Sequence, residues 1–256
     1  MSEPSGASSK ERAISSDTGL EKLIHDQAPE TLIAVASDSR LNEDLALALL
    51  NRRDLPRQAL EELNKNGAVV RHRRVRLAIV MHPRAPRHVS IPTIRHLYPF
   101  ELMQVAMFPA VAADVKRAAE ESLIGKLGTV SPGERLTLAK QGSGRVAAML
   151  LLDKEQRIMQ AALTNPRMTE PLLVRALKAD AGTELLAPAV CNHARWASRI
   201  EIKAALLCNA HTPFARVLQY ASELPLRTLK DLLVNARLRG NARSSINAAL
   251  AQRTKL

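Results

Sequence analysis

The stretch Ala162-Leu-Thr-Asn-Pro-Arg-Met-Thr-Glu-Pro-Leu-Leu-Val-Arg-Ala-Leu177 contains the signals that decide the fold of this 256-residue chain. An apolar run ends at Asn165-Pro166, and a second apolar run begins a few residues later. In the second run, Leu173, Ala176 and Leu177 have the spacing of one helical face. The stretch therefore predicts the end of one short helix, a tight turn and the start of another.

The same pattern continues along the chain and predicts short helices throughout. Another apolar set with helical spacing is Phe214, Val217, Leu218 and Ala221. The segment Ser131-Pro132-Gly133-Glu134 has the form of a capping box with proline at the first helical position. Thr212-Pro213 predicts a second cap of this kind. The chain has 14 prolines, which exclude long helices, so we expect helices of about 8 to 14 residues.

A polar residue recurs at the predicted turns and indicates an internal repeat. These positions are His82, Asn165, Asn192, Asn209 and Asn235. We expect their side chains to hydrogen-bond the loops between helices, which is a structural role. Asn165 and Asn192 are 27 positions apart, whereas Asn192 and Asn209 are only 17 apart, so the repeat is irregular. The residue just before the polar position is apolar at Met81, Cys191, Cys208 and Val234, and we expect it to be buried there.

The pattern around Asn165 resembles the leucine-rich repeat variant and the wider group of HEAT-like repeat proteins. The resemblance extends over roughly residues 30–250. It implies an all-α fold, an irregular right-handed α-solenoid of short antiparallel helix pairs. Some leucine-rich repeat variants carry an iron–sulfur cluster in a cysteine-rich segment. This chain has only two cysteines, so the resemblance implies no cofactor here.

Composition predicts a polar tail followed by one folded domain. Residues 1–17 lack helical periodicity and read as a disordered tail, and residues 18–256 read as a single α-solenoid domain. The N-terminus has no apolar segment of the secretory type, and the longest apolar run, 146–152, is too short to span a membrane. We therefore expect a cytoplasmic protein that does not act at a membrane.

A basic window separates Glu62 from Glu101, with no acidic residue in between. Its candidate partner-binding or anion-binding residues are Arg71, Arg73, Arg74, Arg76, Arg84, Arg87 and Arg95. Together with the formal net charge of +12, they suggest a face for nucleic-acid phosphates or for an acidic protein surface. The alternative is a solvated surface whose acidic partners lie on adjacent helices.

No catalytic or metal-binding signature accompanies this window. Its four histidines lack the spacing of a compact metal site. Trp196, the single tryptophan, fits a gap-filling role between repeats better than a base-stacking role. The sequence favours a non-catalytic scaffold that presents a basic surface to a protein partner. A sequence-independent DNA- or RNA-binding protein that uses residues 65–95 is the alternative, and an enzyme like the HEAT-like DNA glycosylases comes third.

Overall fold

The computed structural model describes residues 19–179, 182–235, 238 and 240–253. Within these ranges the chain is helical with no β-strand, which confirms the all-α prediction. The predicted tail, residues 1–17, lies outside them. Contacts divide the chain into two compact units, residues 1–126 and 127–256. That residues 18–256 form a single domain stays a prediction.

Short helices build both units. Those of the first unit are α2 (Pro29–Ser37), α3 (Glu43–Leu50), α4 (Arg57–Lys65), α5 (Gly67–Val70), α6 (Arg73–Met81), α7 (Arg87–Ile94), α8 (Pro99–Met107) and α9 (Ala113–Lys126). Those of the second are η1 (Leu127–Thr129), α10 (Pro132–Gln141), α11 (Gly144–Leu150), α12 (Gln156–Leu163), α13 (Glu170–Leu177), α14 (Leu186–Cys191), α15 (Ile200–Cys208), α16 (Phe214–Glu223), α17 (Leu226–Asn235) and α18 (Gly240–Arg253). Several are shorter than expected, since α5 has 4 residues and α14 has 6.

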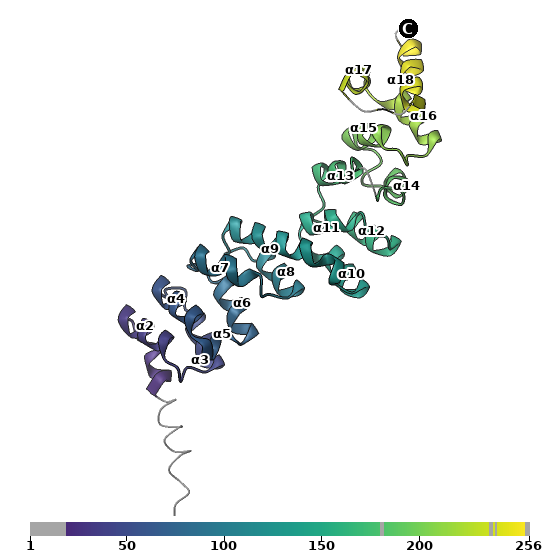
Figure 1. The fold of residues 1–256 in the computed structure, drawn as a ribbon. Coiled ribbons are helices and arrows are strands. Elements are labelled where there is room, and N and C mark those ends of the chain that lie inside the picture. The colour runs from purple at the N-terminus through teal and green to yellow at the C-terminus, as the bar shows by residue number, and fades with distance from the viewer. Residues whose placement is uncertain (1–18, 180–181, 236–237, 239, 254–256) are drawn as a thin grey trace, which may run out of the picture. The chain divides into compact units, whose positions relative to one another are not determined.

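Within each unit, the helices pack in two rows (Figure 1). In the first unit, α2 packs on α4 and α7 on α9, and the second row contains α3, α6 and α8. In the second unit, α10, α12 and α14 follow one another, as do α16 and α18, and the second row contains α11, α13, α15 and α17. Most helices thus contact the next helix of their own row.

The two predicted helix starts have different outcomes. Ser131 accepts a hydrogen bond from the Glu134 backbone, and the Glu134 carboxylate accepts one from the Ser131 backbone, so the capping box is confirmed. The Thr212 cap was wrong. Pro213 is the N-cap of α16, and the Thr212 hydroxyl instead donates to the Leu206 carbonyl, 2.6 Å away. Thr212 therefore bonds back to the last turn of α15.

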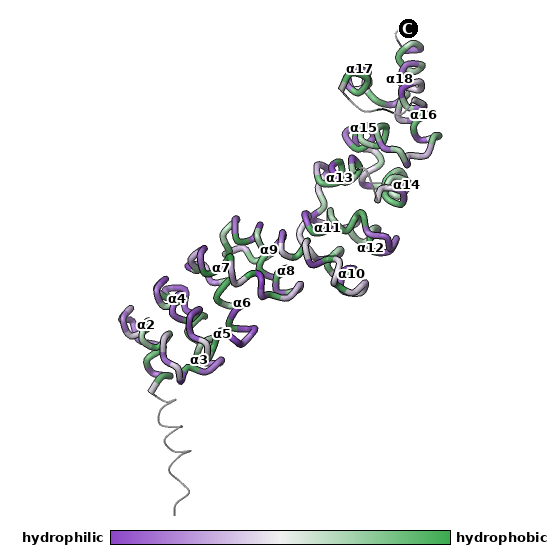
Figure 2. Tube along the Cα trace, viewed as in Figure 1, coloured by the Kyte–Doolittle hydropathy of each residue, from purple (hydrophilic) through white to green (hydrophobic). Residues whose placement is uncertain are grey.

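Aliphatic side chains form the core between the rows. Leu173, Ala176 and Leu177 are buried as their spacing predicts. On α16 the buried side chains are Val217, Tyr220 and Ala221, whereas Phe214 and Leu218 are about half exposed. The predicted apolar face of α16 was therefore only half right. Hydrophobic and hydrophilic residues alternate around the helices instead of separating into whole segments (Figure 2).

Asn165 shows how the turns join successive helices of a row. Its side chain is buried after the end of α12, and its Nδ2 donates to the carbonyls of Ala139 and Gly142, at 2.7 and 3.2 Å, at the end of α10. Its Oδ1 accepts the Arg167 backbone N–H at 2.7 Å. The last carbonyls of a helix have no partner within that helix, and here the following helix pair supplies the donor.

At other turns, a side chain also donates a hydrogen bond to a carbonyl at the end of the preceding helix of the row. Asn209, after α15, donates to the Leu177 carbonyl at the end of α13, 2.6 Å away. Asn66, after α4, donates to the carbonyls of Ala36 and Asp38 at the end of α2. Asn66 was not among the predicted turn positions. Asn165 and Asn209 thus both hydrogen-bond the end of the preceding helix of their row.

In the turn after α14, the residue that hydrogen-bonds the turn backbone is the one that follows the predicted Asn192. Asn192 is exposed and only accepts a hydrogen bond from Arg216. His193 accepts the Arg195 backbone N–H instead, and the buried Trp196 indole donates to the Leu163 carbonyl at the end of α12, 3.0 Å away. Trp196 is thus buried and bonded to the end of α12. The Asn235 side chain lies outside the described part of the chain.

Replacing Asn165 with alanine leaves buried carbonyls at the end of α10 without their donor. We expect Asn165→Ala to lower the free energy of unfolding by about 2–3 kcal/mol in a denaturant titration. Asn192→Ala is the matched control, because the Asn192 side chain is exposed, and it should change stability by less than about 0.5 kcal/mol. Equal losses in the two variants would contradict this role of the buried amide.

Candidate functional site

The seven candidate arginines do not form one cluster. Arg71 is the C-cap residue of α5, Arg84 lies in the turn after α6, and Arg95 is the C-cap residue of α7. Arg73, Arg74 and Arg76 lie on α6 and Arg87 begins α7, so the set is divided between both rows of the first unit.

Three of these arginines face carboxylates from neighbouring helices. Arg73 pairs with Glu101 of α8 at 3.0 Å, and Arg87 pairs with Asp114 of α9 at 2.8 Å. Arg74 lies 3.8 Å from Glu43 of α3, a longer and more exposed pair. The basic window therefore draws its counter-charges from helices outside the window.

The other four have different surroundings. Arg84 Nη1 donates to the Asp54 carbonyl at 2.7 Å, which is a turn-to-turn contact. The Arg71 side chain contacts the ring of the adjacent His72, and Arg95 is exposed. Arg76 is half-buried. Whether any of the seven binds a partner stays a prediction.

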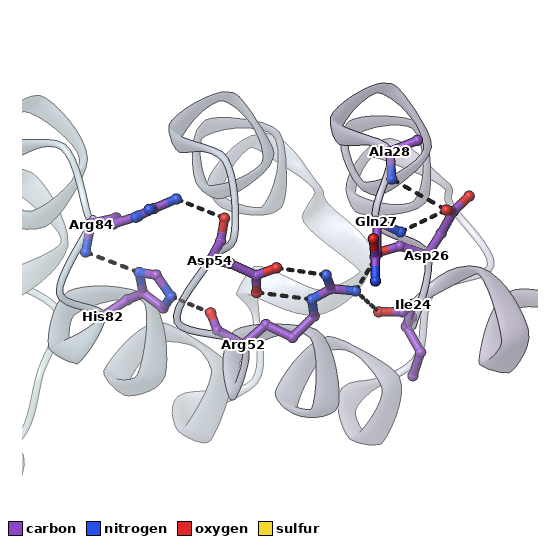
Figure 3. A network of polar contacts seen from close by, with 8 residues as sticks. All are labelled: Ile24, Asp26, Gln27, Ala28, Arg52, Asp54, His82 and Arg84. Atoms are coloured by element: carbon purple, nitrogen blue, oxygen red, sulfur yellow. Dashed lines mark hydrogen bonds and ion pairs between the residues drawn. The ribbon is translucent and has the colours of Figure 1, made fainter.

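His82 lies in a chain of contacts between three successive turns (Figure 3). Its Nε2 is 2.8 Å from the Arg52 carbonyl, and its Nδ1 is 3.1 Å from the Arg84 backbone nitrogen. A carbonyl only accepts and a backbone N–H only donates, so these partners require a neutral ring with its proton on Nε2. His82 thus joins its own turn to the preceding one.

Arg52 continues this chain of contacts toward the N-terminus (Figure 3). Its Nη1 donates to the carbonyls of Ile24 and Asp26, at 2.7 and 2.6 Å. Its other guanidinium nitrogens hold both carboxylate oxygens of Asp54. The Arg52 guanidinium keeps the pKa of Asp54 below its ordinary value. The basic side chains of these turns thus contribute to folding.

A groove of about 610 Å³ opens on the second row of the first unit. Its apolar lining includes Leu47 of α3, Leu77 and Met81 of α6, and Phe108 just after α8. All four are half-buried or exposed, and Phe108 is 38% exposed. The groove therefore offers apolar surface that no other part of the described chain covers.

A second groove, of about 640 Å³, opens on the second row of the other unit. It is lined by side chains of α13, α15 and α17, among them Val174, Cys208 and Leu232. Its charged lining has both signs, with Lys178 together with Glu201 and Asp231. In both units the groove lies on the row formed by the second helices of the pairs.

The position before the turn residue contributes to these grooves. Cys191 is buried as expected, but Met81 and Cys208 are half-buried groove residues and Val234 is 81% exposed. The prediction that this place is always buried was therefore wrong. The sequence signal that could have indicated a groove is the apolar residue that recurs before each of these turns. Where the fold leaves such a residue partly exposed, it becomes available for a groove.

Two observations bear on metal binding and on thiol reactivity. The described residues contain no group of three or more His, Cys, Asp or Glu side chains that could hold a metal ion. Burial raises the pKa of both Cys191 and Cys208 above the ordinary thiol value, which disfavours the reactive thiolate. In the described part of the chain no helix is long and apolar enough to cross a membrane.

Comparison with known proteins adds no relative: no protein-family model, curated protein or solved structure matches the chain.

The position of His82 predicts a pH-dependent stability. Burial, with the charge of Arg84, holds the pKa of His82 below its ordinary value of 6.5. As the pH falls through 6.5, the unfolded chain takes up a proton that the folded ring resists, so the free energy of unfolding decreases. Protonation of the folded ring would place a second N–H against that of Arg84.

We expect His82→Asn to retain the turn, since asparagine fills the equivalent place elsewhere, and to reduce this acid sensitivity. Denaturant titrations at several pH values between 5 and 8 would measure it. The wild-type chain should lose more stability than the variant on acidification. Parallel stability curves for the two proteins would rule out His82 as the source.

Proposed function

We propose that this chain is an irregular right-handed α-solenoid, of the leucine-rich repeat variant or HEAT-like kind, that binds a protein partner without catalysis. Support for the solenoid comes from the row contacts within each unit. It also comes from turn bonds that recur at one-repeat separations, such as Asn66 to Ala36 and Asn209 to Leu177. In such arrays each helix pair buries the apolar face of its neighbour.

The observation that carries the binding proposal is the pair of grooves on the second rows. Each groove crosses at least two helices of its row and has half-buried aliphatic side chains in its lining. Pockets of several hundred Å³ are typical of binding sites, and the lining of the first groove is mainly apolar. Side chains of a protein segment would cover this apolar surface and gain the hydrophobic free energy of its burial.

A protein partner fits these surfaces better than a nucleic acid. Arg73 and Arg87 already face carboxylates at salt-bridge distance, which lowers the positive potential available for phosphates. Base stacking needs exposed aromatic platforms, and Phe108 is the single Phe, Tyr or Trp side chain in the two groove linings. Apolar groove linings match apolar side chains of a protein.

Panning a phage-displayed library of random linear peptides on the full chain tests this function. We expect enriched peptides that lose about tenfold or more in affinity for Leu77→Asp or Val174→Asp, because a carboxylate in the groove cannot be buried cheaply. Leu218→Asp is the matched control, since Leu218 is 49% exposed on α16 and lines neither groove. Circular dichroism checks that each variant is folded.

Two results would overturn the proposal. One is a set of peptides that binds all variants alike, and the other is a library from which no groove-dependent peptide emerges. Mobility shifts on arbitrary duplex DNA and RNA at two salt concentrations provide the second arm. Binding there that weakens steeply with salt would assign the basic surface to nucleic acid instead.

A further inference from the structure

We propose that the groove on α3 and α6 receives an acidic protein segment that carries large apolar side chains. This inference rests on the proposed function and adds the chemical class of the partner. It concerns only the groove of the first unit. The groove of the second unit serves as a comparison for its lining and charge.

The floor of the first groove requires an apolar ligand. Leu47, Leu77, Met81 and Phe108 surround a space of about 610 Å³. None of these side chains is fully buried, so a ligand that covers them removes apolar surface from water. A uniformly charged ligand would leave this surface uncovered or would have to lose its own hydration.

The charged side chains of the lining are all cationic. Arg53 and Arg74 are the arginines of the groove, and no aspartate or glutamate lines it. Arg53 is exposed, and the described part of the chain gives it no ion pair. Arg74 has an exposed side chain, and its nearest carboxylate oxygen, from Glu43, is 3.8 Å away. Both guanidinium groups are therefore able to pair with carboxylates of a ligand.

The groove of the second unit provides an internal contrast. Its lining contains Lys178 together with Glu201 and Asp231, so that groove is not uniformly cationic. The selectivity for an acidic partner is therefore a property of α3, α6 and their turns. It does not follow from the net charge of the chain alone.

Charge also argues against a second copy of this chain as the occupant. The formal net charge is +12, so two copies repel at long range. An amphipathic helix with acidic and apolar faces matches the groove, because helix-in-groove binding uses apolar anchors at spacings of three and four residues. The flanking arginines would then meet the acidic positions beside those anchors.

Three synthetic peptides of about 16 residues test the inference, each with leucine at helical anchor positions. The remaining positions are glutamate in the probe, glutamine in the neutral control and lysine in the basic control. Fluorescence anisotropy with the full chain at low salt should show the glutamate peptide binding about tenfold or more tightly than the glutamine peptide. The lysine peptide should bind most weakly, and added salt should reduce the difference.

Variants place the binding in this groove. Arg53→Gln and Arg74→Gln should each weaken the glutamate peptide about three- to tenfold. Arg57→Gln removes the same charge from an exposed arginine of α4 outside the groove, and should have a much smaller effect. Leu77→Gln should weaken both the glutamate and the glutamine peptides, because both use the apolar floor.

Equal affinity for the glutamate and glutamine peptides would overturn the inference. So would equal losses from Arg57→Gln and Arg53→Gln, which would indicate attraction by net charge alone. If library peptides of another composition still depend on Leu77 or Val174, the scaffold function stands and only the acidic class fails. If no peptide depends on either residue, both proposals fail.

Discussion

The carbonyl groups at the ends of short helices impose the constraint on which this structure depends. A helix of eight or nine residues leaves about half of its carbonyls without an internal partner, so donors must come from elsewhere. Here they come from the end of the next helix in the same row. Asn66, Asn165 and Asn209 donate with amides, and Trp196 with its indole. Basic side chains act in the same way near the ends of α9 and α18, where Lys126 bonds the Leu97 carbonyl and Arg253 bonds the Leu224 carbonyl.

This constraint explains which parts of the fold could be predicted. Local patterns such as the Ser131 capping box and the spacing of Leu173 and Leu177 need only nearby residues, so sequence reading was sufficient. The identity of the turn donor depends on which side chain reaches the preceding helix of the row. Sequence letters could not show that Asn66 makes this contact or that Trp196 replaces Asn192. Several residue types can donate to the carbonyls at a helix end, so no single residue type identifies the turn donor in the sequence.

The charge balance of the basic window could be predicted only in part from the sequence, for a related reason. Acidic residues are absent from the sequence window, but helix packing brings them from one repeat away. Arg73 meets Glu101 and Arg87 meets Asp114, each in the next helix of its row. Arg199 and Glu170 are related in the same way in the second unit. Charge counted along the sequence therefore overstates the free charge on a row, because the repeat spacing also sets which charges become neighbours.

The turn contacts and the groove surfaces are under different physical requirements. A turn donor must reach a carbonyl within hydrogen-bond distance, so its geometry is restricted even where its residue type changes from asparagine to histidine. A groove residue must only be compatible with the packing of the helices in its row, so its residue type can vary. Met81 and Cys208 occupy equivalent places before a turn, yet one lines a groove with only cationic charges and the other a groove of mixed charge. Binding specificity can therefore differ between the two units without any change in the contacts that hold the helices together.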